Sequence, residues 1–546
     1  MFINNAKISE ERSGNIIYWV FLGIIIILVV CIRARLLDIP LERDEGEFAY
    51  CGQMLLQMVP PFKAVYTMKL PGTCFAYSLI MLFLGQTIKG IHLGLLIVNC
   101  LSITLLFLIT KKLWNPRAAI IAALSYAFLS VGPTVLGFAA HASHFIVLAT
   151  LAGTWILLFG LENGRLALYW VSGFLFGLAI LMKQQGIFFV LFGGYLILHA
   201  GLVSQPARIK AIVGRLLIFG AGAIMPLLLV VAIALISGTF DKFWFWTFKY
   251  SAAYAGAVPL SRGMEEFNQS LIEVINSFAL LWIMMAFGFL ILIIDKRLRG
   301  IRWIVLSFSM LSFLSVCAGF YFRSHYFILL FPAGAILIGV FIDSLQYYIS
   351  QKCSYRIIIS LPLLGLFFGI VLGVNAHRDY FLSEKPETLV KTIYGPNPFL
   401  ESLKIAEFLT SRTGAGDKIA VLGSEPQIFF YAQRKSATGY IYTYELTGNH
   451  DYSLSMQKEM IAEIERASPK FLIFIGIIYS WLIQPDSKTL ILNWFQDYSQ
   501  KYYHLVGRVD IVSARETRYF WGGEAGTGKP ESPFSILIYE RRQAPD

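Results

Sequence analysis

Hydrophobic segments of about 20 residues recur through the first two-thirds of this chain and restrict its fold more than any other feature. Each segment is long enough to cross about 30 Å of hydrocarbon as an α-helix. The sequence therefore predicts a polytopic α-helical membrane protein with roughly 11–13 transmembrane helices. The expected spans are 16–33, 72–88, 90–110, 117–137, 144–161, 166–182, 185–201, 211–237, 271–294, 301–321, 326–345 and 356–374.

Composition supports a membrane protein and excludes other classes. Only 14% of the residues are charged, whereas about a quarter are charged in soluble domains. The net charge of +11 falls largely in short loops, which follows the positive-inside rule and gives no reason to expect a nucleic-acid partner. Six scattered cysteines, none of them beyond residue 375, exclude a disulfide framework in the C-terminal part and show no zinc-binding spacing. The first apolar run lacks a cleavage site after it, so we expect a retained anchor.

The character of the chain changes after residue 375, where charged and polar residues return. Short strand-like runs alternate with amphipathic helical ones, a pattern typical of an α/β domain. We therefore divide the chain into a membrane domain, 1–375, and a C-terminal α/β domain, 376–546. The elements expected in the second domain are helices at 398–411 and 456–467 and strands at 418–422, 470–475, 504–511 and 534–539.

The polar loop 34–71 carries three carboxylates within four positions, Asp44, Glu45 and Glu47. Acidic groups beside a bilayer are costly unless they pair, bind a cation or take part in chemistry. Acids also favour the start of a helix through its dipole, but this explains one carboxylate better than three. We predict that Asp44 is a general base whose pKa is raised by partial burial, with a neighbouring acid tuning it.

Two lysines at the boundaries of apolar runs could bind an anion. Lys69 stands before Leu-Pro in YTMKLPG, and Lys183 stands before Gln-Gln-Gly in LMKQQG, where the amides add further donors. A snorkelling interfacial lysine and an ordinary loop lysine are the simpler alternatives. We expect Lys69 to hold the anion of a lipid, with Lys183 as a second cation.

Two further turns carry histidines. His141 and His144 in AAHASHF have a spacing that could bind metal, but no carboxylate is near them in the sequence, so no metal is expected. In FRSHYF, Arg323, His325 and Tyr326 place donors at the end of a span, where they could face an anion. An interfacial aromatic belt is the alternative for this turn.

Taken in order, RDEGEFAY, YTMKLPG, LMKQQG and FRSHYF resemble the motifs of the GT-C superfamily. The closest resemblance is to its protein O-mannosyltransferase and aminoarabinose-transferase-like group, over about residues 15–345. It implies a multispanning enzyme of the plasma (inner) membrane that uses a sugar on a polyprenyl phosphate, with an Asp-Glu pair in the first external loop and an extracytoplasmic C-terminal domain.

The resemblance also implies roles for individual residues. Asp44 matches the catalytic aspartate, and Glu45 matches its partner. The residues that match the family's donor-phosphate elements are Lys69, Lys183, Arg323, His325 and Tyr326. Departures from the family pattern add three possible site residues, namely Glu47, His141 and His144.

The function implied is inverting transfer of a hexosyl or pentosyl group from a polyprenyl-phosphate donor to an acceptor hydroxyl at the outer face. The sequence does not indicate whether the acceptor is a protein, a lipid or a glycan. No cofactor is expected, because several protein cations could match the leaving phosphate, and a bound divalent metal ion is the alternative. A multispanning transporter or lipid flippase is the alternative, although no internal repeat supports it.

Orientation can be counted from the strongly basic loop 295–302, taken as cytoplasmic. The count places everything after residue 375 outside, but it places the loop 34–71 inside, against the function implied. We therefore expect one of the four runs between 72 and 161 to be re-entrant or wrongly divided.

Overall fold

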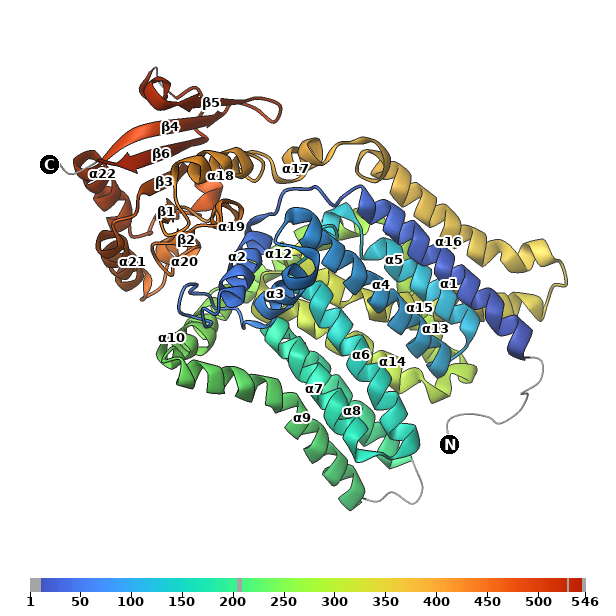
Figure 1. Cartoon of the computed structure of the whole chain (residues 1–546). Coiled ribbons are helices and arrows are strands. Elements are labelled where there is room, and N and C mark those ends of the chain that lie inside the picture. Colours follow the sequence, from blue (N-terminus) through green and yellow to red (C-terminus); the bar gives the residue numbers. More distant parts are fainter. Residues whose placement is uncertain (1–10, 204–208, 528–529, 543–546) are drawn as a thin grey trace.

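The computed structural model describes residues 11–203, 209–527 and 530–542, which form a bundle of apolar helices followed by a smaller region built on a β-sheet (Figure 1). Among the described helices, eight are long and apolar enough to cross a membrane, and one further pair is bent. The predicted fold class, a polytopic helical membrane protein with a C-terminal α/β domain, is confirmed.

The helices of the bundle run between two faces of the molecule (Figure 1). They are α1 (Glu11–Ala34), α4 (Ile88–Leu113), α5 (Pro116–Leu129), α6 (Ala142–Asn163), α7 (Leu166–Met182), α8 (Ile187–Val203), α9 (Ile209–Ile236), α13 (Ala279–Ile294), α14 (Arg302–Cys317), α15 (Phe331–Ser350) and α16 (Arg356–Ala376). Five further helices lie in the connections at one face, and they are α2 (Arg43–Leu56), α3 (Gly72–Leu84), α10 (Phe240–Trp244), α11 (Ser251–Ala255) and α12 (Leu260–Ser277).

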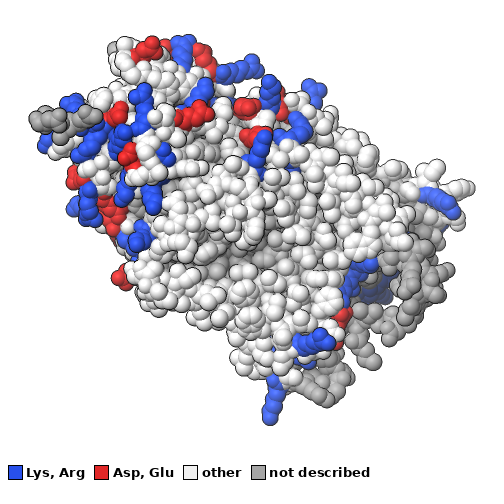
Figure 2. Space-filling model, viewed as in Figure 1, with Lys and Arg blue, Asp and Glu red and all other residues white. Residues whose placement is uncertain are grey.

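The outer surface of the bundle suits contact with lipid. Large apolar side chains such as Ile27 of α1, Leu217 of α9 and Phe367 of α16 are well exposed, which would be costly in water. Figure 2 shows charged residues gathered over the C-terminal domain and again at the opposite end, with a broad band without them between. This distribution matches a protein that spans a bilayer.

The run 72–88 is not a transmembrane span, and this resolves the conflict in the predicted orientation. Helix α3 has only 13 residues and stays beside α2. At its start, the Thr73 hydroxyl donates to the carbonyl of Met182 over 2.9 Å, and just beyond its end Gln53 of α2 donates to Gln86 over 3.0 Å. With α3 held at this face, α4 begins there too, and the loop 34–71 lies on the same face as the C-terminal domain.

The predicted span at 271–294 is wrong in its boundaries. The chain breaks at Phe278, and α12 and α13 meet at 108°. Helix α12 lies at the same face as α2, where the hydroxyls of Ser277 and Thr134 are 2.7 Å apart. The amphipathic sequence of α12 explains the break, because a helix with one polar face is not stable across hydrocarbon.

The C-terminal domain contains a six-stranded mixed sheet in the order β2-β1-β3-β6-β4-β5. Strand β1 pairs in parallel with β2 and β3, while the remaining neighbours are antiparallel. The strands are β1 (Lys418–Leu422), β2 (Lys435–Ser436), β3 (Phe471–Gly476), β4 (Tyr503–Ile511), β5 (Thr517–Trp521) and β6 (Ser535–Arg541). The helices are α17 (Pro386–Tyr394), α18 (Glu401–Arg412), α19 (Gln427–Ala432), α20 (Tyr444–Thr447), α21 (Ser453–Ala467) and α22 (Leu490–Tyr502). Each predicted element of this domain is present within a few residues of its expected bounds.

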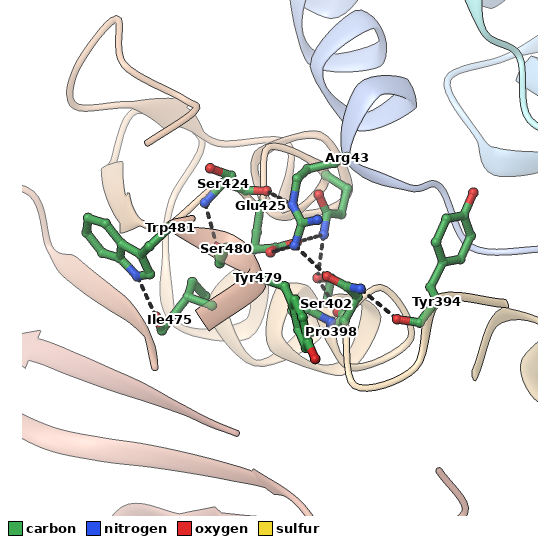
Figure 3. Close-up of polar contacts among 12 residues, drawn as sticks. Arg43, Tyr394, Pro398, Ser402, Ser424, Glu425, Ile475, Tyr479, Ser480 and Trp481 are labelled. Atoms are coloured by element: carbon green, nitrogen blue, oxygen red, sulfur yellow. Dashed lines mark hydrogen bonds and ion pairs between the residues drawn. The ribbon is translucent and has the colours of Figure 1, made fainter. Parts of the chain in front are cut away.

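The turn after β1 fixes this domain onto helix α2 (Figure 3). The Arg43 guanidinium pairs with Glu425 over 2.6 Å and also donates to the carbonyl of Ser424 over 2.7 Å. A side chain at Gly46 would lie 2.6 Å from the backbone nitrogen of Gln427, so only glycine permits this approach. Because the pair is buried, the position of α2 depends on the C-terminal domain.

Candidate functional site

Helix α2 begins with a capping box made entirely of glutamates. Glu42 accepts a hydrogen bond from the backbone N–H of Glu45 over 2.9 Å, and the Glu45 carboxylate accepts from the N–H of Glu42 over 3.3 Å. These reciprocal bonds satisfy two free donors of the first turn and fix its geometry. Burial, and then the charges of Asp44 and Glu45, raise the pKa of Glu42 well above its usual value.

Asp44 and Glu47 are three positions apart, so they lie on one face of α2 and both reach Lys69. The Lys69 ammonium lies 2.8 Å from Asp44 Oδ1 and 2.6 Å from Glu47 Oε2. Lys69 is therefore already ion-paired, although its sequence position suggested a cation reserved for a lipid anion. An ammonium has three donor hydrogens, so one remains for another acceptor.

The charge state of Asp44 differs from the prediction. Burial raises its pKa, but the opposing effects of Lys69, His141 and His325 are larger together, and the net pKa lies well below the usual value. The predicted upward shift is wrong, because the loop sequence does not show which groups the fold brings to this carboxylate. Asp44 is ionised and partly accessible, with 29% of its side chain exposed.

Glu45 points away from Asp44, into the protein. Its carboxylate accepts from the backbone N–H of Ala140 over 2.7 Å and lies 3.1 Å from His92 Nε2. The side chain has no exposed surface. Glu45 therefore ties α2 to α4 and to the turn before α6. In the structure it holds α2 in position, whereas the sequence predicted a catalytic role for it.

Two stacked imidazoles face the other oxygen of Asp44. His141 Nδ1 lies 3.9 Å from Asp44 Oδ2, and the His141 ring stacks on His325 with 4.1 Å between ring centroids. Burial lowers the pKa of both histidines, further for His325 because of the neighbouring His141. Neither ring nitrogen of His141 has a hydrogen-bond partner among the described residues. The two rings can thus form hydrogen bonds with a bound molecule.

Three of the residues from the distant motifs join this cluster. The Lys183 ammonium lies 3.8 Å from the centroid of the Tyr326 ring, and its charge interacts with Asp44, Lys69 and Arg323. Burial lowers the pKa of Lys183 to about 7, and the charges of Lys69 and Arg323 add to this effect. The turn at η6 (Ser324–Leu329) thus places Arg323 and Tyr326 beside Lys183, within electrostatic reach of Asp44.

His144 does not belong to this cluster. It lies one turn into α6, is buried, and has Arg33 and His141 as its electrostatic neighbours. The i, i+3 spacing that suggested a shared metal site puts only His141 at the end of the helix, next to Asp44.

A different set of residues comes nearest to a metal site. Asp44, His141 and His325 each offer one ligand atom, and these atoms lie within 4.8 Å of one another. Two imidazoles and a carboxylate are a donor set that suits zinc. Lys69 and Lys183 also place positive charge beside the same carboxylate. The donor set thus suits a metal ion, while the two neighbouring cations oppose one.

The structure adds two residues that sequence reasoning missed, both from the C-terminal domain. The Tyr442 hydroxyl donates to Asp44 Oδ1 over 2.9 Å. Glu445 is buried, and its charge interacts with Glu47, Lys69 and Asp44. The only available signal was the aromatic run GYIYTYE after the turn at 423–426, which gave no reason to place it beside residue 44.

Comparisons with known proteins point to one class. Residues 69–225 match the family model described as dolichyl-phosphate-mannose-protein mannosyltransferase. No curated protein sequence matches the chain. ArnT from Cupriavidus metallidurans bound to undecaprenyl phosphate has a similar structure, with a TM-score of 0.57 and 12% identity over 97% of this chain and 98% of that one.

A second similar structure is the oligosaccharyltransferase AglB from Archaeoglobus fulgidus, in complex with an inhibitory peptide and a dolichol-phosphate. The TM-score is 0.54 and the identity is 12%, over 98% of this chain and 77% of that one. At such low sequence identity, these two structural similarities establish the fold alone.

Proposed function

Since the chain has the fold of the GT-C membrane glycosyltransferases, as its sequence motifs indicate, we propose that it transfers a sugar from a polyprenyl-phosphate donor to an acceptor hydroxyl with inversion. One observation carries the proposal. An ionised carboxylate, Asp44, and three cations from three distant segments, Lys69, Lys183 and Arg323, come together at one face of the bundle.

Asp44 takes the proton of the acceptor hydroxyl. Its Oδ1 is held by Lys69 and Tyr442, which leaves Oδ2 as the oxygen that can accept a proton. A carboxylate with a lowered pKa is a weak base, so proton transfer follows the early steps of bond formation, when the attacking oxygen has become acidic. The acceptor oxygen attacks the anomeric carbon from the face opposite the phosphate, which leaves with the electron pair of the broken C–O bond.

The leaving phosphate is stabilised by the cations on the far side of Asp44. Lys183 and Arg323 lie next to each other there, with the hydroxyl of Tyr326 and the imidazole of His325 as further donors. The third donor hydrogen of Lys69 can join them. Preplaced donors in a site with little water commonly supply several kcal/mol of transition-state stabilisation. The similar ArnT and AglB structures were each solved with a polyprenyl phosphate, which supports a donor of this class.

The reaction takes place at the external face. The opposite face of the bundle carries the basic loops, among them Lys111-Lys112 at the end of α4 and Lys296–Gly300 before α14. By the positive-inside rule that face is cytoplasmic. The acidic loop and the C-terminal domain are then extracytoplasmic, in an integral membrane protein of the plasma membrane.

The decisive experiment compares cells with and without the gene, complemented by the wild type or by Asp44→Asn. Mass spectrometry of lipid-linked sugars and surface glycans should show one lipid-linked sugar accumulating and one glycan modification missing in the deletion and in the Asp44→Asn strain. A flux assay on the purified protein in vesicles tests the transporter alternative. Normal glycans in the Asp44→Asn strain would disprove the proposal.

A further inference from the structure

The C-terminal domain reaches into the site through residues 442–445. The Tyr442 hydroxyl donates to Asp44 Oδ1, and the Lys69 ammonium lies 5.5 Å from the centre of the same ring. Tyr442 is buried, so this hydrogen bond is made away from bulk water. A hydrogen bond to an ionised acceptor is about twice as strong as one between neutral groups, so Tyr442 restrains the Asp44 carboxylate.

The segment is rigidly held. The backbone N–H of Thr443 donates to Ser424 Oγ over 2.9 Å, and the Thr443 hydroxyl donates to the carbonyl of Ser480 over 2.9 Å. Ser424 and Ser480 belong to the turns at the ends of β1 and β3, beside the pair formed by Arg43 and Glu425 (Figure 3). The position of Tyr442 is thus fixed by the same contacts that dock the domain on α2.

Glu445 follows three positions later. Only 9% of its surface is exposed, and its Oε2 has no hydrogen-bond partner among the described residues. Its charge interacts with Glu47, Lys69 and Asp44, and it also affects Tyr250 from the segment after α10. A buried carboxylate oxygen without a partner is destabilising, and a donor on a bound molecule would relieve this.

We propose that residues 442–445 form the acceptor side of the transfer site, where Tyr442 orients Asp44 and Glu445 accepts a hydrogen bond from a hydroxyl or ammonium group of the acceptor. The inference rests on the proposed glycosyl transfer and assigns a purpose to the C-terminal domain. Lys69 and Tyr442 hold Oδ1 of Asp44, so the acceptor hydroxyl meets Oδ2. A second polar group of the acceptor reaches Glu445, and the carboxylates of Glu47 and Glu445 disfavour an anionic group there.

If Tyr442 orients Asp44 and Glu445 binds the acceptor, their substitution should change different kinetic constants, kcat for Tyr442 and the acceptor KM for Glu445. The test uses the full-length protein in vesicles, with labelled lipid-linked sugar as donor and an envelope extract of cells lacking the gene as acceptor. Tyr442→Phe should lower kcat roughly tenfold or more with little change in the apparent KM for the extract, because it acts through Asp44. Glu445→Gln should raise that KM roughly tenfold and leave the donor KM unchanged.

Tyr431→Phe is the matched control. The Tyr431 hydroxyl accepts from the backbone N–H of Leu41 over 2.8 Å, so this variant also removes one docking hydrogen bond but none to Asp44. It should change neither constant by more than about twofold. Tyr442→Phe should also move the acid limb of the kcat–pH profile to higher pH, which a loss of docking alone would not do.

The outcomes separate the two proposals. If Tyr442→Phe and Glu445→Gln match Tyr431→Phe in kcat, KM and pH profile, the acceptor-side assignment is wrong and the transferase function stands. If the wild type transfers no lipid-linked sugar to the extract, the transferase function itself fails. If Tyr442→Phe lowers the apparent Tm more than the control does, the kcat–pH profile of the remaining activity is the test. If its acid limb does not move, the role of Tyr442 is wrong.

Discussion

The Lys69 ammonium lies 2.8 Å from Oδ1 of Asp44, and this contact sets the chemistry of the site. The ion pair keeps Asp44 ionised, because it opposes the effect of burial and lowers the pKa of the carboxyl. It also occupies one oxygen and leaves Oδ2 toward His141. The catalytic candidate is thus a permanently charged, oriented carboxylate, with only one oxygen available to the acceptor.

Replacing Asp44 by asparagine should abolish turnover while the donor still binds. General-base catalysis contributes about 10²–10⁴-fold, so kcat should fall by about that factor. Lys69 keeps its partner Glu47 in this variant, so the donor-phosphate cations stay in place. Labelled transfer and donor binding are measured together. Asp38→Asn is the control, because Asp38 lies in the same loop and forms only an exposed ion pair with Lys89. Turnover of the Asp44→Asn enzyme within about tenfold of the wild type would remove the base assignment.

Lys69→Ala should move the acid limb of kcat/KM to higher pH and raise the donor KM. Lys69 lowers the pKa of Asp44, so its removal raises that pKa, and the base is then lost by protonation at a higher pH. The profile is recorded from about pH 4.5 to 8, which covers this rise. Lys63→Ala, at an exposed position of the same loop, should leave the profile unchanged. An unshifted acid limb in Lys69→Ala would show that Asp44 does not control the reaction.

Donor binding should weaken as the pH rises through about 7, the pKa of Lys183. A lysine is cationic below its pKa, so its attraction for the donor phosphate is present below about pH 7 and is lost above it. Lys183→Arg should remove this dependence, because arginine stays charged. The donor KM of the wild type and of Lys183→Arg is measured at about pH 6.0 and 8.5. This constant is distinct from the acceptor KM, which tests Glu445. An equal rise of the donor KM in both proteins would contradict the assignment.

Glu425→Gln should destabilise the docked C-terminal domain. Removing one partner of a buried ion pair costs about 3–5 kcal/mol, and here it leaves Arg43 uncompensated next to Asp44. We expect a clear drop in the apparent Tm together with reduced transfer. Glu407→Gln, at an exposed position on α18, is the control and should have no effect on either quantity. A Tm equal to that of the control would show that the pair does not hold the domain in place.

Transfer should survive the removal of divalent metal ions. Lys69 and Lys183 place positive charge beside Asp44, and this opposes a cation bound by Asp44, His141 and His325. Dialysis against EDTA, with the metal content checked by elemental analysis, should leave kcat unchanged. Loss of activity that returns with zinc or manganese, and that does not return in His141→Ala, would establish a metal site instead.

The sequence by itself determined the membrane class, most of the spans and the strands of the C-terminal domain, because each follows from local hydrophobicity and its periodicity. It also indicated the motifs around residues 44, 69, 183 and 323, since charged groups at the ends of apolar runs stand out. The sequence did not show that α3 is not a transmembrane span, because an interfacial helix and a short span have the same composition.

Only the tertiary structure decided what each charged group does. Asp44 and Glu45 are adjacent in the sequence, yet the helical turn of about 100° between them sends one to the site and the other to His92. The pKa of Asp44 depends on Lys69, His141 and His325, which come from three separate segments, and its orientation depends on Tyr442, 398 positions away. Electrostatic interactions act through space, so their sign and size are fixed by which distant segments the fold brings together.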